Sequence, residues 1–280
     1  MPALPDEVGR ASTLAEPAAA YRASALVRRA LLALAAVIAL AMVALGTLSL
    51  LDLAARHTTE ERATYTDVRA LVVDDASDIR LTSARAGAPL QVVARVTEGL
   101  ASPERRARRR ADGTLRLSAS CPGFPGGQCN VRYEVRVPTG TLVRADASVG
   151  DIVAENLRTS APLDLSSSAG DVTAIGVSTP ALRLSSTGGD VRARGVGSDR
   201  VWVRSSAGDV AVSLLAPTAR LEARSSGGDV DVLVPDAVYR VEADTTAGDV
   251  DTADVRTAPD SPRRIIAGSS AGDIRVAVRR

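Results

Sequence analysis

Residues Leu163 to Ala174 read LDLSSSAGDVTA, and six further segments of the chain align with them without gaps. In each segment, apolar residues alternate with polar ones before and after a Gly-Asp pair, which is typical of two strands joined by a turn. Successive segments begin 19 to 24 residues apart. The others are VRADASVGDIVA from Val143, LRLSSTGGDVRA from Leu182, VWVRSSAGDVAV from Val201, LEARSSGGDVDV from Leu221, VEADTTAGDVDT from Val241 and IIAGSSAGDIRV from Ile265.

A repeat of this size cannot bury its apolar face alone, and it gains a core only by stacking on its neighbours. We therefore predict that residues 141–280 form an all-β, β-helix-like solenoid of about seven coils, with about 20 residues in each. The alternative is an antiparallel sandwich, because hairpins also use Gly-Asp turns. The same turn residues recur at nearly constant spacing, and this favours stacking.

Residues 66–140 also alternate like strands, but they repeat less regularly. The segment ALVVDDASDIRL from Ala70 looks like a degenerate unit, with Asp78-Ile79 where Gly-Asp-Val would fall. Terminal units of repeat domains are atypical because they must cap the core. We expect residues 66–140 to form an irregular β cap at the N-terminal end of the solenoid.

Residues 30–51 form a run of 22 residues without a charge. As a helix this run would be about 33 Å long, enough to cross a hydrocarbon core about 30 Å thick. Arginines precede it and mixed charges follow it, so the positive-inside rule predicts one transmembrane helix with a cytoplasmic N-terminus and an extracytoplasmic C-terminal domain. A cleaved signal peptide is the alternative, although its apolar region is usually shorter. Residues 1–29 are expected to be a disordered cytoplasmic tail, and residues 52–65 a linker.

The charged residues are nearly balanced, with 34 positive and 33 negative side chains, and every positive one is Arg. The chain has no Lys, a single His (His57) and two Cys. This composition excludes a Schiff-base lysine and a multi-Cys/His zinc site, and any His-based catalytic triad would have to use His57. We expect no catalytic residues, no cofactor and no metal. Nucleic acid is not expected as a partner either.

The Gly-Asp pairs would stack into a ladder of turn residues. We predict a structural role for the ladder, in which each Asp accepts backbone N–H groups at its own turn. Shared calcium is the alternative, but calcium-binding solenoid repeats place their Asp every nine residues. Neighbouring Ser and Thr residues lack a His or Lys within the domain to activate them as nucleophiles. The ladder comprises Gly150, Asp151, Gly170, Asp171, Gly189, Asp190, Gly208, Asp209, Gly228, Asp229, Gly248, Asp249, Gly272 and Asp273.

Two features of residues 66–140 remain. Cys121 and Cys129 frame the loop CPGFPGGQC, and outside the cytoplasm we expect them to form a disulfide. The run ASPERRARRRADG is interpreted as a solvated loop, or else as a patch for anionic lipid headgroups or acidic envelope polymers. Its arginines are Arg105, Arg106, Arg108, Arg109 and Arg110.

Together, the apolar helix, the Val137-Pro138-Thr139-Gly140 step and the S-S-A-G-D-V units resemble the bacterial putative-adhesin family of β-strand-repeat domains, a domain of unknown function. The resemblance covers residues 66–280, implies an envelope-exposed β-repeat domain and offers no catalytic residues. The function we expect is therefore a non-enzymatic, single-pass envelope protein for interaction or scaffolding, with an unknown protein or polymer as partner. The alternatives are a membrane sensor that couples the solenoid to the cytoplasmic tail in an envelope stress response and, with less support, a glycan-active enzyme.

Overall fold

The computed structural model describes residues 18–99, 102–120 and 130–279, which divide into two compact units, residues 1–51 and 52–280. In the first unit, helix α1 (Ala18–Ala55) contains the predicted apolar run. Its segment Val27–Ala55 contains an 18-residue stretch with a mean hydropathy of 2.6 and is long and apolar enough to cross a membrane. The helix starts earlier than expected, because the Ala-rich residues before the run are good helix formers. Residues 18–29, expected to be disordered, are therefore helical.

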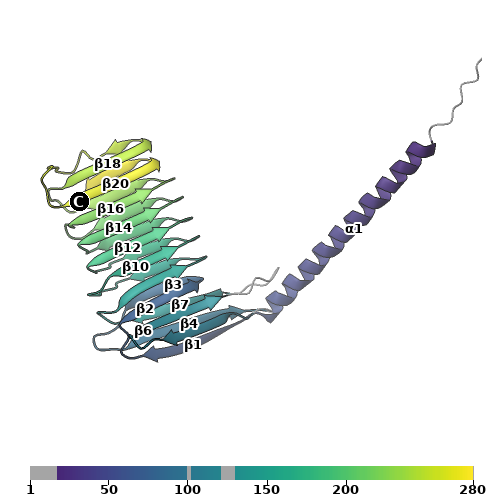
Figure 1. Cartoon of the computed structure of the whole chain (residues 1–280), viewed down its shortest axis with the longest axis horizontal. Helices are drawn as coiled ribbons and strands as arrows, with labels where there is room; N and C mark the ends of the chain where they lie inside the picture. Colours follow the sequence, from purple (N-terminus) through teal and green to yellow (C-terminus); the bar gives the residue numbers. More distant parts are fainter. Residues whose placement is uncertain (1–17, 100–101, 121–129, 280) are drawn as a thin grey trace, which may run out of the picture. The chain divides into compact units, whose positions relative to one another are not determined.

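The second unit is all-β and consists of two open sheets, which confirms the solenoid-like fold (Figure 1). We call the larger one sheet A. Its strands, in spatial order, are β1 (His57–Tyr65), β4 (Leu90–Glu98), β7 (Asn130–Val137), β3 (Asp78–Ser83), β9 (Ile152–Glu155), β11 (Val172–Ile175), β13 (Val191–Val196), β15 (Val210–Leu214), β17 (Val230–Val234), β21 (Ile274–Val278) and β19 (Val250–Asp251).

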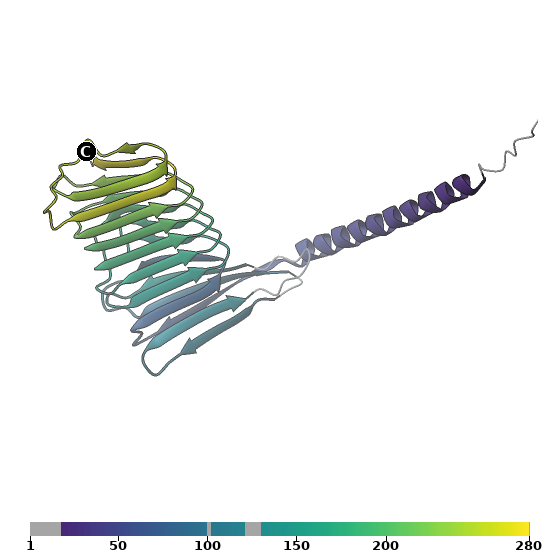
Figure 2. The ribbon, with the colours of Figure 1, turned by 45° about the horizontal axis from the view of Figure 1, so that its top comes forward.

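Sheet B contains the first strand of each repeat. Within the repeats its strands are parallel, and Figure 2 shows them stacked coil upon coil. Their spatial order is β18 (Arg240–Ala247), β20 (Arg264–Ala271), β16 (Arg220–Ser225), β14 (Arg200–Ser205), β12 (Ala181–Ser186), β10 (Leu163–Ser167), β8 (Leu142–Ala147), β2 (Ala70–Ala76), β6 (Thr114–Ser120) and β5 (Glu104–Arg109).

The core lies between the two sheets and is built from small aliphatic side chains. Leu163 and Leu165 are buried, and the intervening Asp164 points outward, as the alternation predicts. The same positions pair in register from coil to coil, for example Leu163 with Leu182. Aligned repeats therefore give one continuous apolar column along the stack.

Units do not stack in the order of the sequence at either end. The last unit of the chain, β20 and β21, is inserted between β16 and β18 in sheet B and between β17 and β19 in sheet A. At the other end, the degenerate unit β2–β3 lies between β8–β9 and the strands β6 and β7. The segment from Ala70 is therefore a regular member of the stack, whereas the repeat from Val241 forms its terminal unit.

The irregular cap consists of antiparallel strands. β1 pairs with β4, β4 with β7, and β5 with β6. Two expectations are corrected here: residues 57–65, expected as linker, form strand β1, and most of the arginine run forms edge strand β5 rather than a loop. In both cases the neighbouring strand offers an unpaired edge, and backbone pairing there extends the sheet.

Candidate functional site

The aspartate ladder joins neighbouring units through the backbone. Oδ1 of Asp190 accepts the N–H of Asp209 at 2.8 Å, and Oδ1 of Asp209 accepts that of Asp229 at 2.9 Å. The same bond runs between every adjacent pair of units from Asp78 to Asp249. The expectation that each aspartate accepts an N–H of its own turn was wrong, and the structural role of the ladder stays a prediction. The N–H donor that each carboxylate accepts belongs to the next coil, because stacked turns lie about 4.8 Å apart, within reach of a carboxylate.

Glycine precedes each aspartate because adjacent turns pass very close together. A Cβ atom on Gly189 would lie 2.4 Å from the carbonyl oxygen of Gly170. The φ angle of Gly189 is not positive, so close approach, rather than a left-handed backbone, requires glycine at this position.

In three inner coils a buried hydroxyl bridges two turns. Ser205 is fully buried, donates to the carbonyl oxygen of Gly189 at 2.8 Å and accepts the N–H of Gly208 at 2.9 Å. Ser167 and Ser186 do the same in their coils. These hydroxyls hold the backbone together. Among residues 18–99, 102–120 and 130–279, no cluster of three His, Cys, Asp or Glu side chains is placed to hold a metal ion.

The arginines of β5 divide between its two faces. Arg105 is opposite buried Ala119 and therefore lies on the core side, where it forms a two-pronged ion pair with Glu61 of β1 at 2.7 and 2.8 Å. Because β1 edges sheet A and β5 edges sheet B, this pair joins the two sheets at the end of the stack. The Arg105 guanidinium holds the pKa of Glu61 below its usual value, mainly through the hydrogen bond.

Arg106 and Arg108 lie on the outer face, beside a depression of about 450 Å³ that Arg109 and Arg110 also line. Arg109 is opposite buried Leu115 and therefore lies, like Arg105, on the core side. Arg108 lies directly opposite Arg116 of β6, so the Cβ atoms of these two positively charged residues are about 5 Å apart. Arg106 pairs with Glu104 at 2.9 Å, and Arg116 pairs with Asp74 at 2.5 Å. We call this surface the arginine face, and it is lined by Arg106, Arg108, Arg109, Arg110, Arg116 and Ser118.

Charge on the arginine face is incompletely balanced. Within the part of the chain that the structure describes, Arg108, Arg109 and Arg110 form no ion pair. The nearby carboxylate of Asp112 instead accepts the backbone N–H of Thr114 in the hairpin turn. An excess of positive charge therefore remains around the depression, and this makes it a candidate anion site.

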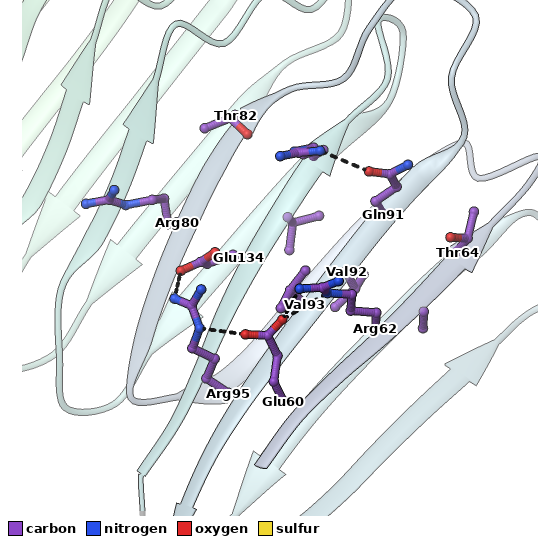
Figure 3. A pocket seen from close by; sticks show the side chains of 13 residues that line it. Glu60, Arg62, Thr64, Arg80, Thr82, Gln91, Val92, Val93, Arg95 and Glu134 are labelled. Atoms are coloured by element: carbon purple, nitrogen blue, oxygen red, sulfur yellow. Dashed lines mark hydrogen bonds and ion pairs between the residues drawn. The ribbon is translucent and has the colours of Figure 1, made fainter. Parts of the chain in front are cut away.

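A second depression, of about 590 Å³, lies on the outer face of sheet A at the same end of the stack. Its central charges are paired: Figure 3 shows Arg95 between Glu60 and Glu134, with Arg62 on the other side of Glu60. Arg80 and Arg136 also line it, so arginines outnumber carboxylates in this depression too. The hydrogen bonds from Arg62 and Arg95 lower the pKa of Glu60.

Sequence reasoning found only part of the arginine face. Arg116 and Ser118 were missed, and Arg105 was included although it points to the core side. The Asp112-Gly113 turn between two alternating segments could have indicated the β5–β6 hairpin and placed Arg116 beside Arg108. Cys121 and Cys129 lie outside the described residues, so their disulfide stays a prediction.

Comparison with known proteins adds a family and a fold. Residues 126–280 match the family model described as Toastrack DUF4097. A "putative adhesin" from Bacteroides fragilis has a TM-score of 0.50 and 17% identity, over 79% of this chain and 97% of that one. A "putative cell adhesion protein" from Clostridium sporogenes (TM-score 0.38, 12% identity) is similar over 80% of this chain and 100% of its own. A "putative adhesin" from Parabacteroides merdae (TM-score 0.41, 12% identity) is similar over 77% of this chain and 95% of its own. No curated protein matches the chain.

Proposed function

The chain belongs to the Toastrack DUF4097 family, and we propose that it is a non-enzymatic, single-pass envelope protein that presents its β domain outside the membrane for interaction or scaffolding. The observation that carries the proposal is the combination in one chain of an apolar helix, Val27–Ala55, with a stack of repeated coils. The helix supplies the anchor, and the coils supply an extended surface.

The use of polar groups in the coils supports a structural domain rather than an enzyme. The buried hydroxyls, such as that of Ser205, are occupied by backbone groups of adjacent turns. The turn aspartates likewise accept backbone N–H groups. A nucleophile needs a base within hydrogen-bonding distance, and these hydroxyls contact the backbone instead.

The orientation follows from the charges around the helix. Arg22, Arg28 and Arg29 precede the apolar run, and acidic residues dilute the positive charge that follows it. Because positively charged flanks stay in the cytoplasm, the β domain is assigned to the outside.

Topology can be tested with single cysteines in a variant that carries Cys121→Ser and Cys129→Ser. Ser206→Cys places a thiol on an exposed turn of the β domain, and Ser12→Cys places one in the tail. A membrane-impermeant maleimide should label position 206 in intact cells, and position 12 only after permeabilisation. The reverse pattern would refute the orientation, and a mature protein that lacks the helix by mass would refute the anchor.

The interaction role needs a second experiment. A photo-crosslinking residue at position 206, on the exposed turn, should yield discrete crosslinked products in intact cells. The matched control is the same residue at position 12 in the tail. Products from position 12 alone would favour a cytoplasmic role and contradict the proposal.

A further inference from the structure

We propose that the outer face of sheet B binds an acidic polysaccharide, with a sugar carboxylate between Arg200 and Arg204 and the sugar ring against Trp202. These residues lie on strand β14 and alternate with its buried valines, so all of them project outward. We call them the Arg-Trp-Arg site. This inference deepens the proposed function by naming the chemistry of the partner, and it rests on that function for access of the β domain to polymers of the envelope.

The neighbouring strand β16 shows how a carboxylate fits between two such arginines. There Glu222 lies between Arg220 and Arg224, and its carboxylate pairs with both, at 3.3 Å from Nη2 of Arg220 and 3.0 Å from Nε of Arg224. The register aligns Trp202 with Glu222 and each arginine of the Arg-Trp-Arg site with an arginine of β16. Strand β14 therefore repeats the pair of arginines but has a ring in place of the carboxylate.

The arginines of β14 carry charge that the protein itself does not neutralise. Arg200 and Arg204 are exposed, and among the residues that the structure describes neither of them has an ion-pair partner. Glu222 is already shared by the two arginines of its own strand. A carboxylate supplied by a ligand above Trp202 would accept charge-assisted hydrogen bonds from two guanidinium groups, as Glu222 does on β16.

The ring of Trp202 indicates what kind of molecule carries this carboxylate. Trp202 is half-buried, and its indole presents a large apolar surface between two cations. Arg183 of β12 approaches the ring, with Cζ 5.8 Å from the ring centre, and adds a third guanidinium group. Asp164 of β10 is in register with Arg183 and offsets part of that charge. A uronic acid matches this arrangement, because its ring has an apolar C–H face and a carboxylate at its edge.

Depressions beside Arg204 leave room for a ligand longer than one sugar. Arg204 lines one depression of about 330 Å³ toward β10 and a second of about 540 Å³ toward β18. Serine and threonine make up most of the lining of the first, and its carboxylates, Asp75 and Asp146, already accept the hydroxyls of Ser148 and Ser166. Hydroxyl groups can donate to and accept from the hydroxyls of a sugar. A linear polysaccharide therefore suits this surface along the stack of coils.

A simpler role for the same arginines is solubility. Exposed charge keeps a broad sheet face from associating with other molecules, and this role requires no ligand. An acidic polypeptide or a phosphate polymer would be attracted by the arginines alone, without need of the ring. Trp202 separates these explanations because it is the single tryptophan of the chain, so its emission reports on the Arg-Trp-Arg site.

The test uses the full chain in a neutral detergent and follows the fluorescence of Trp202 during titration with polygalacturonate, a linear polymer of a uronic acid. We expect a saturable change in emission. The fully methyl-esterified polymer, which keeps the sugar and lacks the charge, should produce no change. High salt should weaken the binding of polygalacturonate, because the arginines are exposed.

Arg200→Gln together with Arg204→Gln should weaken the binding of polygalacturonate by roughly tenfold or more, as expected for the loss of hydrogen bonds from charged donors. The matched control is Arg194→Gln with Arg275→Gln, which removes the same charge from exposed positions of sheet A and should leave the affinity unchanged. Melting temperatures measured without ligand show whether both double variants are folded.

Substitution of the ring gives a second, independent test. Trp202→Glu copies the sequence pattern of β16 and places the chain's own carboxylate between the two arginines, so it should abolish retention on immobilised polygalacturonate. Trp202→Gln removes the ring without supplying a carboxylate and should weaken retention less than Trp202→Glu does. Equal retention of the two variants would contradict the role of the arginine pair as a carboxylate site.

Unchanged emission together with no retention on polygalacturonate would overturn the proposal and leave solubility as the role of the arginines. Equal weakening by the sheet A control would show attraction to net charge and overturn the site. Binding of polyglutamate or polyphosphate as tight as that of polygalacturonate would overturn the assignment to a polysaccharide. Because these measurements are made in detergent, they are independent of topology, whereas failure of the proposed orientation is detected by the cysteine labelling.

Discussion

The backbone N–H of Asp249 donates to Oδ1 of Asp273 at 2.9 Å, although Asp273 lies 24 residues later in the chain. Asp273 in turn donates its own N–H to Asp229 at 2.8 Å. The last repeat of the sequence is therefore an inner unit, bonded on both sides, and the repeat that contains Asp249 closes the stack.

This order predicts unequal effects of two equivalent substitutions. Asp273→Ala removes the acceptor of the Asp249 N–H and should lower the free energy of unfolding by about 1 kcal/mol, the usual net value of one hydrogen bond. Asp249→Ala should cost less, because within the described chain no further unit donates to its carboxylate. Denaturant unfolding of both variants checks the difference, and a larger loss for Asp249→Ala would contradict the stacking order.

The ladder should also be independent of metal. Because each carboxylate accepts a backbone N–H, a chelator should leave the melting temperature of the unmutated protein unchanged. A calcium-dependent ladder would melt at a much lower temperature in chelator and recover when calcium is added, since a bound ligand stabilises the folded state by mass action.

The two adjacent glycines 188 and 189 should differ strongly in their tolerance of alanine. Gly189→Ala brings a Cβ to 2.4 Å from a backbone oxygen of the previous coil and should destabilise the domain by about 3 kcal/mol, as overpacking does. Gly188→Ala meets its nearest atom at 3.4 Å, and alanine already occupies this position at Ala169 and Ala207. Thermal melts of the two variants give the comparison, and equal melting temperatures would contradict the close approach.

The paired hydroxyls offer a similar contrast. Ser205→Ala leaves the Gly208 N–H and the Gly189 carbonyl without their partner at a fully buried site, so a loss of about 1–3 kcal/mol is expected. Ser206→Ala, on the exposed side of the turn, should change stability by less than about 0.5 kcal/mol. Chemical denaturation measures both, and similar losses would show that burial of the hydroxyl does not matter.

Much of the repeat architecture could be predicted because alternation and turn residues are local signals. The buried positions, such as Leu163 and Leu165, follow from the period of two. The order of units at the ends could not be predicted, because every unit presents the same Gly-Asp edge to its neighbours. The longer connection of residues 252–263 before β20 is the one hint in the sequence of an exchange there.

The candidate site was predicted less well because it depends on strand pairing across the cap. A run of arginines shows charge, but only the register of β5 against β6 sends Arg105 to the core side and brings Arg116 beside Arg108. The hydrogen bond from the Asp229 N–H to the Asp209 carboxylate was missed for a related reason. That carboxylate can reach backbone N–H groups of its own turn and of the neighbouring turn, and the sequence alone does not distinguish them.

The link between the two sheets at the end of the stack should be sensitive to acid. The Arg105 guanidinium lowers the pKa of Glu61, so the ion pair stabilises the folded state above the usual glutamate pKa near 4.3. This contribution is lost as the pH falls through the lower pKa of the folded state. Because Glu61 is more than half exposed, the pair should contribute no more than about 1 kcal/mol.

Glu61→Gln should therefore lower the melting temperature at neutral pH. The difference from the unmutated protein should shrink as the pH falls below the usual glutamate pKa near 4.3 and vanish below the lower pKa of the folded state. Glu104→Gln is the matched control, because Glu104 pairs with Arg106 within β5 and does not join the sheets. Hydrogen exchange should locate the effect of Glu61→Gln in β1 and β5, the two strands that the ion pair connects. A difference in melting temperature that persists unchanged at low pH would show that the pair is not the source of the stabilisation.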